Sequence, residues 1–382
     1  MSDTPPEIQL RGLTRRFREG TRDHLVLDGI DLDIARGETV ALRGRSGSGK
    51  STLLNLVGGI DAPDAGTVNV AGVEVTALTE RERTLFRRER IGFVYQSFNL
   101  VPTLNVADNV RLVLELNKVP PDESSRRIAE LLQAVGLADR AMSFPDVLSG
   151  GEQQRVVLGR VLAQEPTVLL LDEPLAALDR KLRKEMQIEL KRIQREVGTT
   201  FLNVTHDQKE ALSLSDRIGV MRKGKLLQIG TPNQIYEMPR TKFIATFMGA
   251  TNIFPGRVVS KIKNTIELEI ENGSKVFAPL PENFDLESVV GFSVHPELID
   301  IVTNKEKKLW GDPQEETTFS GKIKEVIYQG DYSELTISLD HLPLNLSTFI
   351  TRGSEYDTQD IRENQDVVVF WASNDNNVLL KD

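Results

Sequence analysis

Apolar residues gather in short runs along the first 230 residues, and helix-like segments separate these runs. The clearest runs are ETVALRG (38–44), TVLLLDEP (167–174) and TTFLNVTH (199–206). A run that stays apolar without alternation is typical of a strand buried on both faces. The first run enters a glycine-rich loop and continues as a helix over residues 51–58. This alternation of strands and helices predicts a mostly parallel α/β sheet.

The longest helical signal lies between the second and third runs, over residues 178–198. Its apolar residues recur at spacings of three and four, as on one face of an α-helix: Leu182, Met186, Leu190, Ile193 and Val197. Gly198 follows and can end the helix in the left-handed conformation. Further on, MRKGKLLQIG (221–230) predicts a hairpin that turns at Lys223–Gly224.

Residues 77–140 differ from their surroundings, because charged helical stretches dominate and strand signals are weak. The stretches TERERTLFRRER and ESSRRIAELLQAVGL are the clearest examples. They predict a helical insert between the strands that reaches to about residue 150.

The pattern changes again beyond residue 250. Six short β-type runs follow one another, separated by turn residues: RVVSKI, TIELEI, KVFAPL, GKIKEVIY, ELTISL and DVVVFW. They indicate an all-β barrel or sandwich, with a charged loop at 305–316 inside it. The expected organisation is a first domain over 1–240, a linker over 241–250 and a β domain over 251–382.

Composition narrows the class of protein. Of 382 residues, 39% are hydrophobic and 27% are charged, which is typical of soluble globular proteins. The sequence contains no cysteine, which excludes disulfides and thiolate metal sites. No apolar run is long enough to span a bilayer, and the first residues lack the pattern of a signal peptide. These features favour the cytosol.

The formal charge of −9 is unevenly distributed, with +2 on residues 1–250 and −11 on residues 251–382. Proteins that bind nucleic acids generally need a basic surface. We therefore expect no nucleic-acid partner and interpret the acidic end as solvation of a small β domain.

Residues 44–51, GRSGSGKS, fit the pattern G-x-x-x-x-G-K-[ST] between a predicted strand and a predicted helix, the context that this phosphate-binding loop requires. Backbone N–H groups can surround the β- and γ-phosphates, Lys50 adds a positive charge, and Ser51 offers its hydroxyl to Mg²⁺. The predicted nucleotide-binding residues here are Gly44, Arg45, Ser46, Gly47, Ser48, Gly49, Lys50, Ser51 and Thr52.

Two carboxylates, Asp172 and Glu173, end the second apolar run. Open α/β sheets bind ligands at the carboxyl ends of their strands, so both should lie beside the phosphate-binding loop. We predict that Asp172 anchors Mg²⁺ through water and that Glu173 polarises the attacking water as general base.

A second anion-binding signal lies about a hundred residues after the first. The sequence LSGGEQQRV (148–156) places Ser149, Gly150 and Gly151 at the start of a predicted helix, where free N–H groups and the positive helix end favour an anion. One nucleotide does not need two such sites so far apart, so this one lacks a phosphate in its own chain.

Taken in order, GRSGSGKST, LSGGEQQRV, VLLLDEP and NVTHD resemble the nucleotide-binding subunit of ATP-binding-cassette (ABC) transporters. The resemblance implies the fold of a P-loop NTPase with a helical insert, followed here by an OB-like (TOBE-type) β domain. It implies that two copies bind ATP and Mg²⁺ in a head-to-tail dimer. Ser149, Gly150, Gly151 and Glu152 of one copy would then contact the ATP held by the other.

The resemblance also implies roles for residues outside these motifs. Phe17 fits the aromatic residue that stacks on adenine, although chance packing is the alternative. Gln96 fits the glutamine that reaches Mg²⁺ and the attacking water. Asp179 fits the loop that communicates across the dimer, and His206 fits the switch histidine at the γ-phosphate. Glu152 departs from the glutamine of many members.

The two parts of the chain resemble different transporters. Residues from about 165 to 382 resemble the ATPases of spermidine/putrescine importers, with His295 in place of a usual arginine in FSVHPELIDI. The earlier part, with LVGGIDAPDAGTV and RRERIGFVYQSFNLVPTLNVADNV, is more similar to ATPases of lipoprotein-releasing and macrolide-efflux exporters. We favour the importer because such exporter ATPases usually stop near residue 230 and lack the β domain.

The importer resemblance implies two integral membrane permeases, a periplasmic or extracellular solute-binding protein, and a peripheral location on the cytoplasmic face of the inner membrane. Two other hypotheses make different predictions. A soluble ABC ATPase acting on DNA or ribosomes would need coiled-coil inserts or a tandem cassette, and the sequence has neither. A ligand-binding β module would predict a small ligand for residues 251–382.

Overall fold

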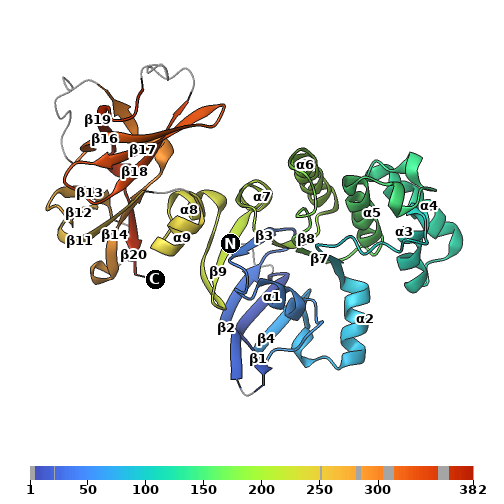
Figure 1. Cartoon of the computed structure of the whole chain (residues 1–382). Helices are drawn as coiled ribbons and strands as arrows, with labels where there is room; N and C mark the ends of the chain where they lie inside the picture. The colour runs from blue at the N-terminus through green and yellow to red at the C-terminus, as the bar shows by residue number, and fades with distance from the viewer. Residues whose placement is uncertain are drawn as a thin grey trace. The chain divides into compact units, whose positions relative to one another are not determined.

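The computed structural model describes residues 5–20, 22–249, 252–280, 285–303, 314–351 and 361–381. The chain divides into two compact units, Met1–Pro232 and Asn233–Asp382 (Figure 1). The first contains both predicted anion-binding motifs. Among the described residues, no helix has the length and apolar character needed to cross a bilayer.

The centre of the first unit is a six-stranded sheet in the order β10-β9-β3-β8-β7-β6. Its strands are β3 (Thr39–Gly44), β6 (Ile91–Val94), β7 (Val168–Asp172), β8 (Thr200–Val204), β9 (Arg217–Arg222) and β10 (Lys225–Gly230). All neighbours run parallel except β9 and β10, which form the predicted hairpin. Lys223 and Gly224 take φ values of 48° and 79° at its turn, and a type I′ turn requires positive φ at both central residues. The predicted parallel sheet is confirmed.

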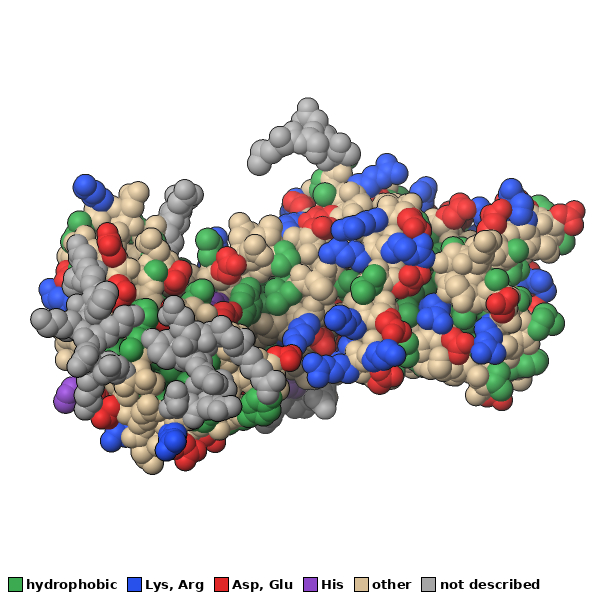
Figure 2. Space-filling model, turned by 90° about the horizontal axis from the view of Figure 1, so that it is seen from above, with side chains coloured by type: hydrophobic (Ala, Val, Ile, Leu, Met, Phe, Trp, Pro, Cys, Tyr) green, Lys and Arg blue, Asp and Glu red, His purple; other side chains and the backbone are tan. Residues whose placement is uncertain are grey.

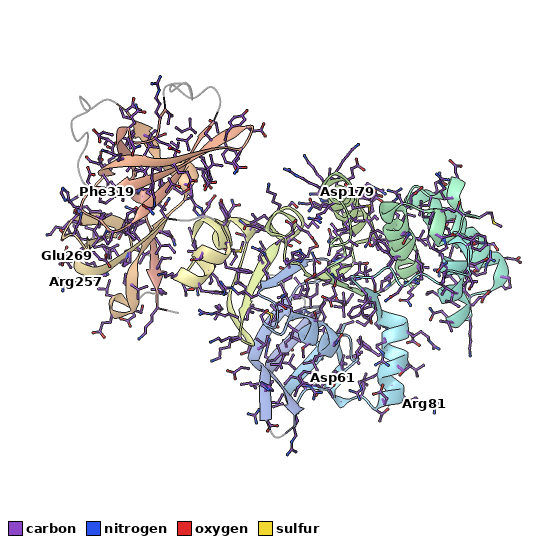
Figure 3. All side chains as sticks on the ribbon, in the orientation of Figure 1. Asp61, Arg81, Asp179, Arg257, Glu269 and Phe319 are labelled. Carbon is purple, nitrogen blue, oxygen red and sulfur yellow. The ribbon has the colours of Figure 1, made fainter. Side chains whose placement is uncertain are left out.

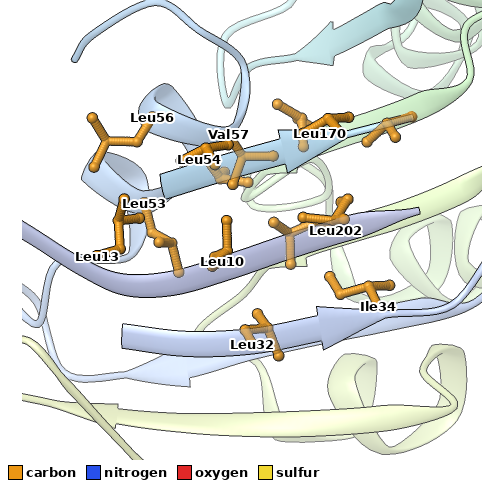
Figure 4. Packing of buried hydrophobic residues seen from close by; sticks show 14 of the residues in the cluster. Leu10, Leu13, Leu32, Ile34, Leu53, Leu54, Leu56, Val57, Leu170 and Leu202 are labelled. Atoms are coloured by element: carbon orange, nitrogen blue, oxygen red, sulfur yellow. The ribbon is translucent and has the colours of Figure 1, made fainter. Parts of the chain in front are cut away.

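A second, antiparallel sheet was not identified from the sequence. It has the order β2-β1-β4-β5, formed by β1 (Ile8–Glu19), β2 (Arg22–Ile34), β4 (Ala65–Val70) and β5 (Val73–Glu74). Its apolar side chains share one core with α1 (Lys50–Val57) and with the central sheet, as Figure 4 shows. Leu10 and Leu32 meet Leu53, Leu170 and Leu202 there. This core fixes the helix that follows the phosphate-binding loop.

The predicted helical region contains α2 (Glu80–Arg90), α3 (Val106–Leu116) and α4 (Pro121–Ala134), and α5 (Gly150–Leu162) begins at its end. It also contains β6, which the sequence analysis did not predict as a strand. Gly92 lets β6 pack closely against α5, because a Cβ at this position would lie 2.4 Å from Val161 Cγ1. β6 is the edge strand that joins this region to the central sheet.

The predicted helix over 178–198 is α6 (Arg180–Val197), and Gly198 ends it with φ of 67°. Met186, Leu190 and Ile193 are buried as predicted, whereas Val197 is 50% exposed, because it lies in the last turn at the surface. α7 (Gln208–Leu214) follows β8.

The second unit is built from two five-stranded antiparallel sheets, in the orders β13-β12-β11-β14-β20 and β15-β19-β16-β17-β18. The strands are β11 (Asn252–Ile262), β12 (Thr265–Ile270), β13 (Lys275–Pro279), β14 (Val289–Val294), β15 (Asp300–Val302), β16 (Glu316–Tyr328), β17 (Tyr332–Leu339), β18 (Asn345–Thr351), β19 (Asp366–Ala372) and β20 (Asn377–Leu380). All six predicted β runs form strands, and the OB-like class is confirmed. Most of the charged loop 305–316 lies outside the described residues.

Stacked aromatic rings fill the middle of this β unit. The rings of Phe254 and Phe292 lie 4.8 Å apart, and Trp371 packs beside them. The Trp371 indole donates to Asn376 Oδ1 at 2.7 Å, which satisfies its buried N–H. Two short helices, α8 (Pro232–Glu237) and α9 (Lys242–Phe247), come before the first of these strands, and α9 occupies most of the expected linker.

Candidate active site

The phosphate-binding loop leaves β3 at Gly44 and enters α1 at Lys50. Two of its glycines lie so close to neighbouring backbone that a side chain would not fit. A Cβ on Gly44 would lie 2.5 Å from the Met221 carbonyl oxygen, and one on Gly49 would lie 2.7 Å from the Val26 carbonyl oxygen. Gly49 also has φ of 101°, which side chains rarely adopt. The loop therefore keeps a tight backbone path without bulky side chains at these glycines, which lets an anion approach its backbone closely.

Lys50 curls back over this loop. Its Nζ donates to the carbonyl oxygens of Gly44 at 2.9 Å and Arg45 at 3.2 Å. Burial lowers the pKa of Lys50, and the nearby carboxylates of Glu173 and Asp172 partly offset this effect. The ammonium is thus desolvated and held by neutral carbonyls, which a phosphate oxygen can replace as a stronger acceptor.

Ser51 and Asp172 are brought together as predicted partners for a cation. Ser51 Oγ donates to Asp172 Oδ1 at 3.2 Å across the gap between α1 and β7. Burial raises the pKa of Asp172, and the Ser51 hydroxyl opposes that shift. A hydroxyl and a carboxylate are hard oxygen ligands, which Mg²⁺ prefers. The donor set therefore fits Mg²⁺.

Glu173 stands in a strained backbone conformation at the end of β7. Its φ of 50° is left-handed, which costs about 1–3 kcal/mol for a side chain of this size. Its N–H donates to the Val204 carbonyl oxygen at 2.9 Å, which anchors the turn to β8. Its Oε2 lies 3.2 Å from Nδ1 of His206, so the carboxylate and the imidazole face each other.

Gln96 follows β6 and is exposed. β6, β7, β8 and β3 are parallel, so their carboxyl ends share one edge of the sheet. Gln96, Glu173, His206 and the phosphate-binding loop follow the ends of four different strands, β6, β7, β8 and β3, and therefore lie at that carboxyl-terminal edge. The strand order accounts for the convergence that the sequence analysis expected.

Phe17 lies on β1 in the antiparallel sheet rather than at that edge, and it is 42% exposed. The Arg15 guanidinium carbon stands 4.8 Å from the ring centroid. Asp61 holds Arg15 through two hydrogen bonds of 2.9 Å. The ring thus has a cation stacked near it, and its predicted contact with adenine stays a prediction.

Ser149 begins α5 and forms a reciprocal cap with Glu152. The Ser149 hydroxyl accepts from the Glu152 N–H at 3.3 Å, and Glu152 Oε2 accepts from the Ser149 N–H at 2.9 Å and from its hydroxyl at 2.8 Å. These hydrogen bonds from Ser149, with help from Arg140, lower the pKa of Glu152. In this chain the Glu152 carboxylate is therefore the anion held at the start of α5, where the LSGG motif (148–151), called the signature below, begins the helix. The spacing S-x-x-E could have predicted this cap.

The signature glycines also set helix packing. A Cβ on Gly151 would lie 2.5 Å from Leu182 Cδ1, so α5 and α6 approach each other through Gly151. A Cβ on Gly150 would lie 3.3 Å from Leu178 Cδ2.

Asp179 caps α6 and is exposed. Its Oδ1 accepts from the N–H groups of Lys181 and Leu182, both at 3.0 Å. Figure 3 labels it beside α6. This local role explains the residue type at this position, and communication across a dimer stays a prediction.

A buried polar network beneath His206 was missed from the sequence. Arg43 on β3 is buried, and its Nη2 donates to the His206 carbonyl oxygen at 3.0 Å. Burial lowers the pKa of Arg43. Glu210 is buried too and accepts from Asn203 at 3.0 Å and Thr205 at 2.9 Å, and burial raises its pKa. The one sequence signal was an arginine inside the apolar run of β3.

Comparison with known proteins agrees with this geometry. The model of the family described as ABC transporter matches residues 27–176. The curated spermidine/putrescine import ATP-binding protein PotA of Thermobifida fusca is 42% identical over 87% of this chain and 83% of its own length. The protein of the same name from Marinobacter nauticus is 40% identical over 96% of this chain and 93% of its own length.

Among solved structures, the dimeric ATP-binding cassette MJ0796 in a post-hydrolysis state with ADP and phosphate is 36% identical. Its TM-score is 0.54, and the match covers 59% of this chain and 98% of that one. The family resemblance predicted from the motifs is confirmed. The chain belongs to the ATP-binding subunits of ABC transporters, the ATP-hydrolysing proteins of these systems.

Proposed function

We propose that this chain hydrolyses ATP to drive the import of polyamines, spermidine or putrescine. One observation carries the ATPase: the phosphate-binding loop, Asp172, Glu173 and His206 converge at one edge of a single parallel sheet. The solute is supported by the names of the curated relatives, which align with the β unit as well as the first unit. It is also supported by the β unit itself, which exporter ATPases of the alternative type usually lack.

In the proposed site, the nucleotide phosphates lie against residues 44–52, with Phe17 on the adenine. Ser51, Asp172 and Gln96 would hold Mg²⁺, which offsets the charge of the phosphate oxygens when bound. Lys50 exchanges its carbonyl acceptors for a phosphate oxygen.

In this proposal Glu173 accepts a proton from the attacking water, which is supported by its position directly after Asp172 at the end of β7. His206 faces the same carboxylate and orients it, and its imidazole is 62% exposed at the site. Arg43 holds the backbone of His206 from below.

Two copies complete two sites in the proposed assembly. Ser149, Gly150, Gly151 and Glu152 of one copy face the ATP of the other, and Asp179 lies at the join. Because Glu152 already occupies the Ser149 donors, the closing phosphate has to displace that carboxylate or share the donors with it. Closure is then driven by ATP and reversed after hydrolysis.

The proposed assembly includes two integral membrane permeases and a periplasmic or extracellular solute-binding protein, and it sits at the cytoplasmic face of the inner membrane. Nucleic acid is not among the proposed partners. Acidic side chains lie among the basic ones on the face shown in Figure 2, and the net charge is −9.

The test is purification of the E173Q chain from its native membranes with ATP present, followed by mass spectrometry of the co-purifying proteins. Two small permeases, and ATPase activity of the wild-type complex that rises with a polyamine-loaded binding protein, are expected. A single permease with a large periplasmic domain would instead support a lipoprotein-releasing or macrolide-efflux exporter, which the earlier part of the chain resembles.

A further inference from the structure

Arg183 joins two separate segments of the active-site edge. From the first turn of α6, its Nη2 donates to the Leu178 carbonyl oxygen at 2.9 Å and its Nε to the Leu175 carbonyl oxygen at 3.3 Å. Its Nη1 lies 3.3 Å from Oδ2 of Asp207. A planar guanidinium can hold several acceptors at fixed angles, which a lysine cannot do.

The first segment, residues 175–178, is the turn between Glu173 and Asp179. The Ala176 N–H donates to the Glu173 carbonyl oxygen at 3.2 Å, and the Leu178 N–H donates to that of Leu175 at 3.2 Å. The turn is therefore continuous, by hydrogen bonds, with the proposed general base at one end. At its other end it leads directly into Asp179, at the proposed join of the dimer.

The second segment is residues 206–207. Asp207 caps α7 by accepting from the Glu210 N–H at 3.1 Å, and its own N–H donates to the Thr205 hydroxyl at 3.1 Å. Although burial opposes it, the backbone N–H groups of Glu210 and Lys209, together with Arg183, lower the pKa of Asp207. Arg43 fixes the neighbouring His206 carbonyl oxygen.

We propose that Arg183 is a positioning residue that couples the turn 175–178, and with it Asp179, to His206. The inference rests on the proposed function and adds its regulation: contact with the partner subunit at Asp179 reaches the imidazole of the same chain through Arg183 and Asp207. The two charged side chains are 30% and 25% exposed, so the pair is screened less than one at the open surface. An arginine that served only to stabilise the end of one helix would contact one of these segments, whereas Arg183 contacts both.

The test compares R183A, R183K and the control R195A, which changes an exposed arginine near the other end of α6. Steady-state ATPase of the full chain gives kcat, KM for ATP and the Hill coefficient. For R183A we expect kcat to fall roughly tenfold and the Hill coefficient to approach one, while KM stays within about twofold; tenfold lies in the usual range of coupling between sites. R183K should restore little of the lost kcat, because lysine keeps the charge but lacks the planar guanidinium that holds three acceptors at once. R195A should behave as wild type.

Two outcomes for the single variant R183A would overturn the inference. One is an R183A chain with unchanged kcat and Hill coefficient. The other is a fall in kcat that follows only a loss of folded protein, measured as a lowered melting temperature with unchanged Hill coefficient. A double variant R183A/D207N no worse than R183A alone would support the coupling, and additive losses would contradict it. If the wild-type chain hydrolyses no ATP, the proposed function fails instead, and this is a separate result.

Discussion

Nδ1 of His206 lies 3.2 Å from Oε2 of Glu173, although the two residues are 33 positions apart in the chain. The contact spans the ends of β7 and β8, which are neighbours in the sheet. The left-handed backbone of Glu173 and the Arg43 hydrogen bond to the His206 carbonyl each support one side of it. The pair is thus held on both sides by contacts within the chain itself.

Glu173→Gln should remove the base and keep the shape. We expect ATP binding to persist and the ATP-bound dimer to accumulate, while turnover falls by roughly 10²–10⁴, the usual effect of losing a general base. This corresponds to about 3–5 kcal/mol. Phosphate release and size-exclusion chromatography measure the two effects. Near-normal turnover would contradict the assignment.

Lys50→Ala should weaken ATP binding itself, since the desolvated ammonium over the loop is then gone. Equilibrium binding of a fluorescent ATP analogue measures the affinity. Asn55→Ala, further along α1 and outside the predicted nucleotide-binding residues, is the matched control for helix stability. If affinity held and only turnover fell, the loop would not be the phosphate site.

A mixture of Ser149→Ala and Glu173→Gln chains tests whether the signature works between subunits. Each mixed dimer would contain one site with both defects and one site with neither, so activity should rise above that of either variant alone. Ser149→Ala also removes a helix cap, which costs about 1 kcal/mol, so its melting temperature is measured first. No recovery on mixing would count against the head-to-tail arrangement.

Asp172→Asn should stabilise the nucleotide-free protein and abolish its stabilisation by Mg²⁺ with ATP. Burial raises the pKa of Asp172 in the folded chain above its unfolded value, so the charged form is penalised in the folded state. That penalty applies above the folded pKa and disappears as pH falls through it. The gain in melting temperature should therefore be largest at neutral pH and shrink in acid. A variant less stable than wild type at neutral pH would refute this.

Glu152→Gln keeps the reciprocal cap, because an amide oxygen can still accept from Ser149, but removes the negative charge. In the Glu173→Gln background, the ATP concentration for half-maximal dimer formation should fall about two- to fivefold, the usual effect of one charge at a helix end. The difference should diminish at high salt. An unchanged or higher concentration would mean that the carboxylate does not compete with phosphate.

The long apolar runs and the glycine-rich motifs predicted most of the central sheet and the loop on it, because both signals are local. β6 was missed because only four residues, Ile91–Val94, stand between an arginine-rich helix and a polar loop. β1 and β2 were missed because irregularities in their pairing, such as the one between Leu10 and Leu13, interrupt the alternation of buried and exposed positions.

The contacts of Arg43 and Arg183 could not be predicted in this way. Each depends on which strand ends meet in space, and that follows from the strand order β3-β8-β7. A sequence pattern fixes spacing along one element but not the partner that another element brings. Glu152 lies between these cases. Its cap is local and follows from the spacing S-x-x-E, but its position in LSGGE also fits a contact with nucleotide, which is the role that was predicted.

The approach of α5 to α6 at Gly151 bears on how genetic results at this motif are interpreted. A Cβ there would lie 2.5 Å from Leu182 Cδ1, so any substitution first forces the Leu182 side chain of the same subunit to move. A transport-defective allele at Gly151 then changes the packing within its own subunit, whatever its effect on nucleotide binding. Ser149 lies at the exposed start of the same helix and, among the described residues, its hydroxyl forms only the local cap with Glu152, so loss of transport there can be assigned to chemistry once the melting temperature is unchanged.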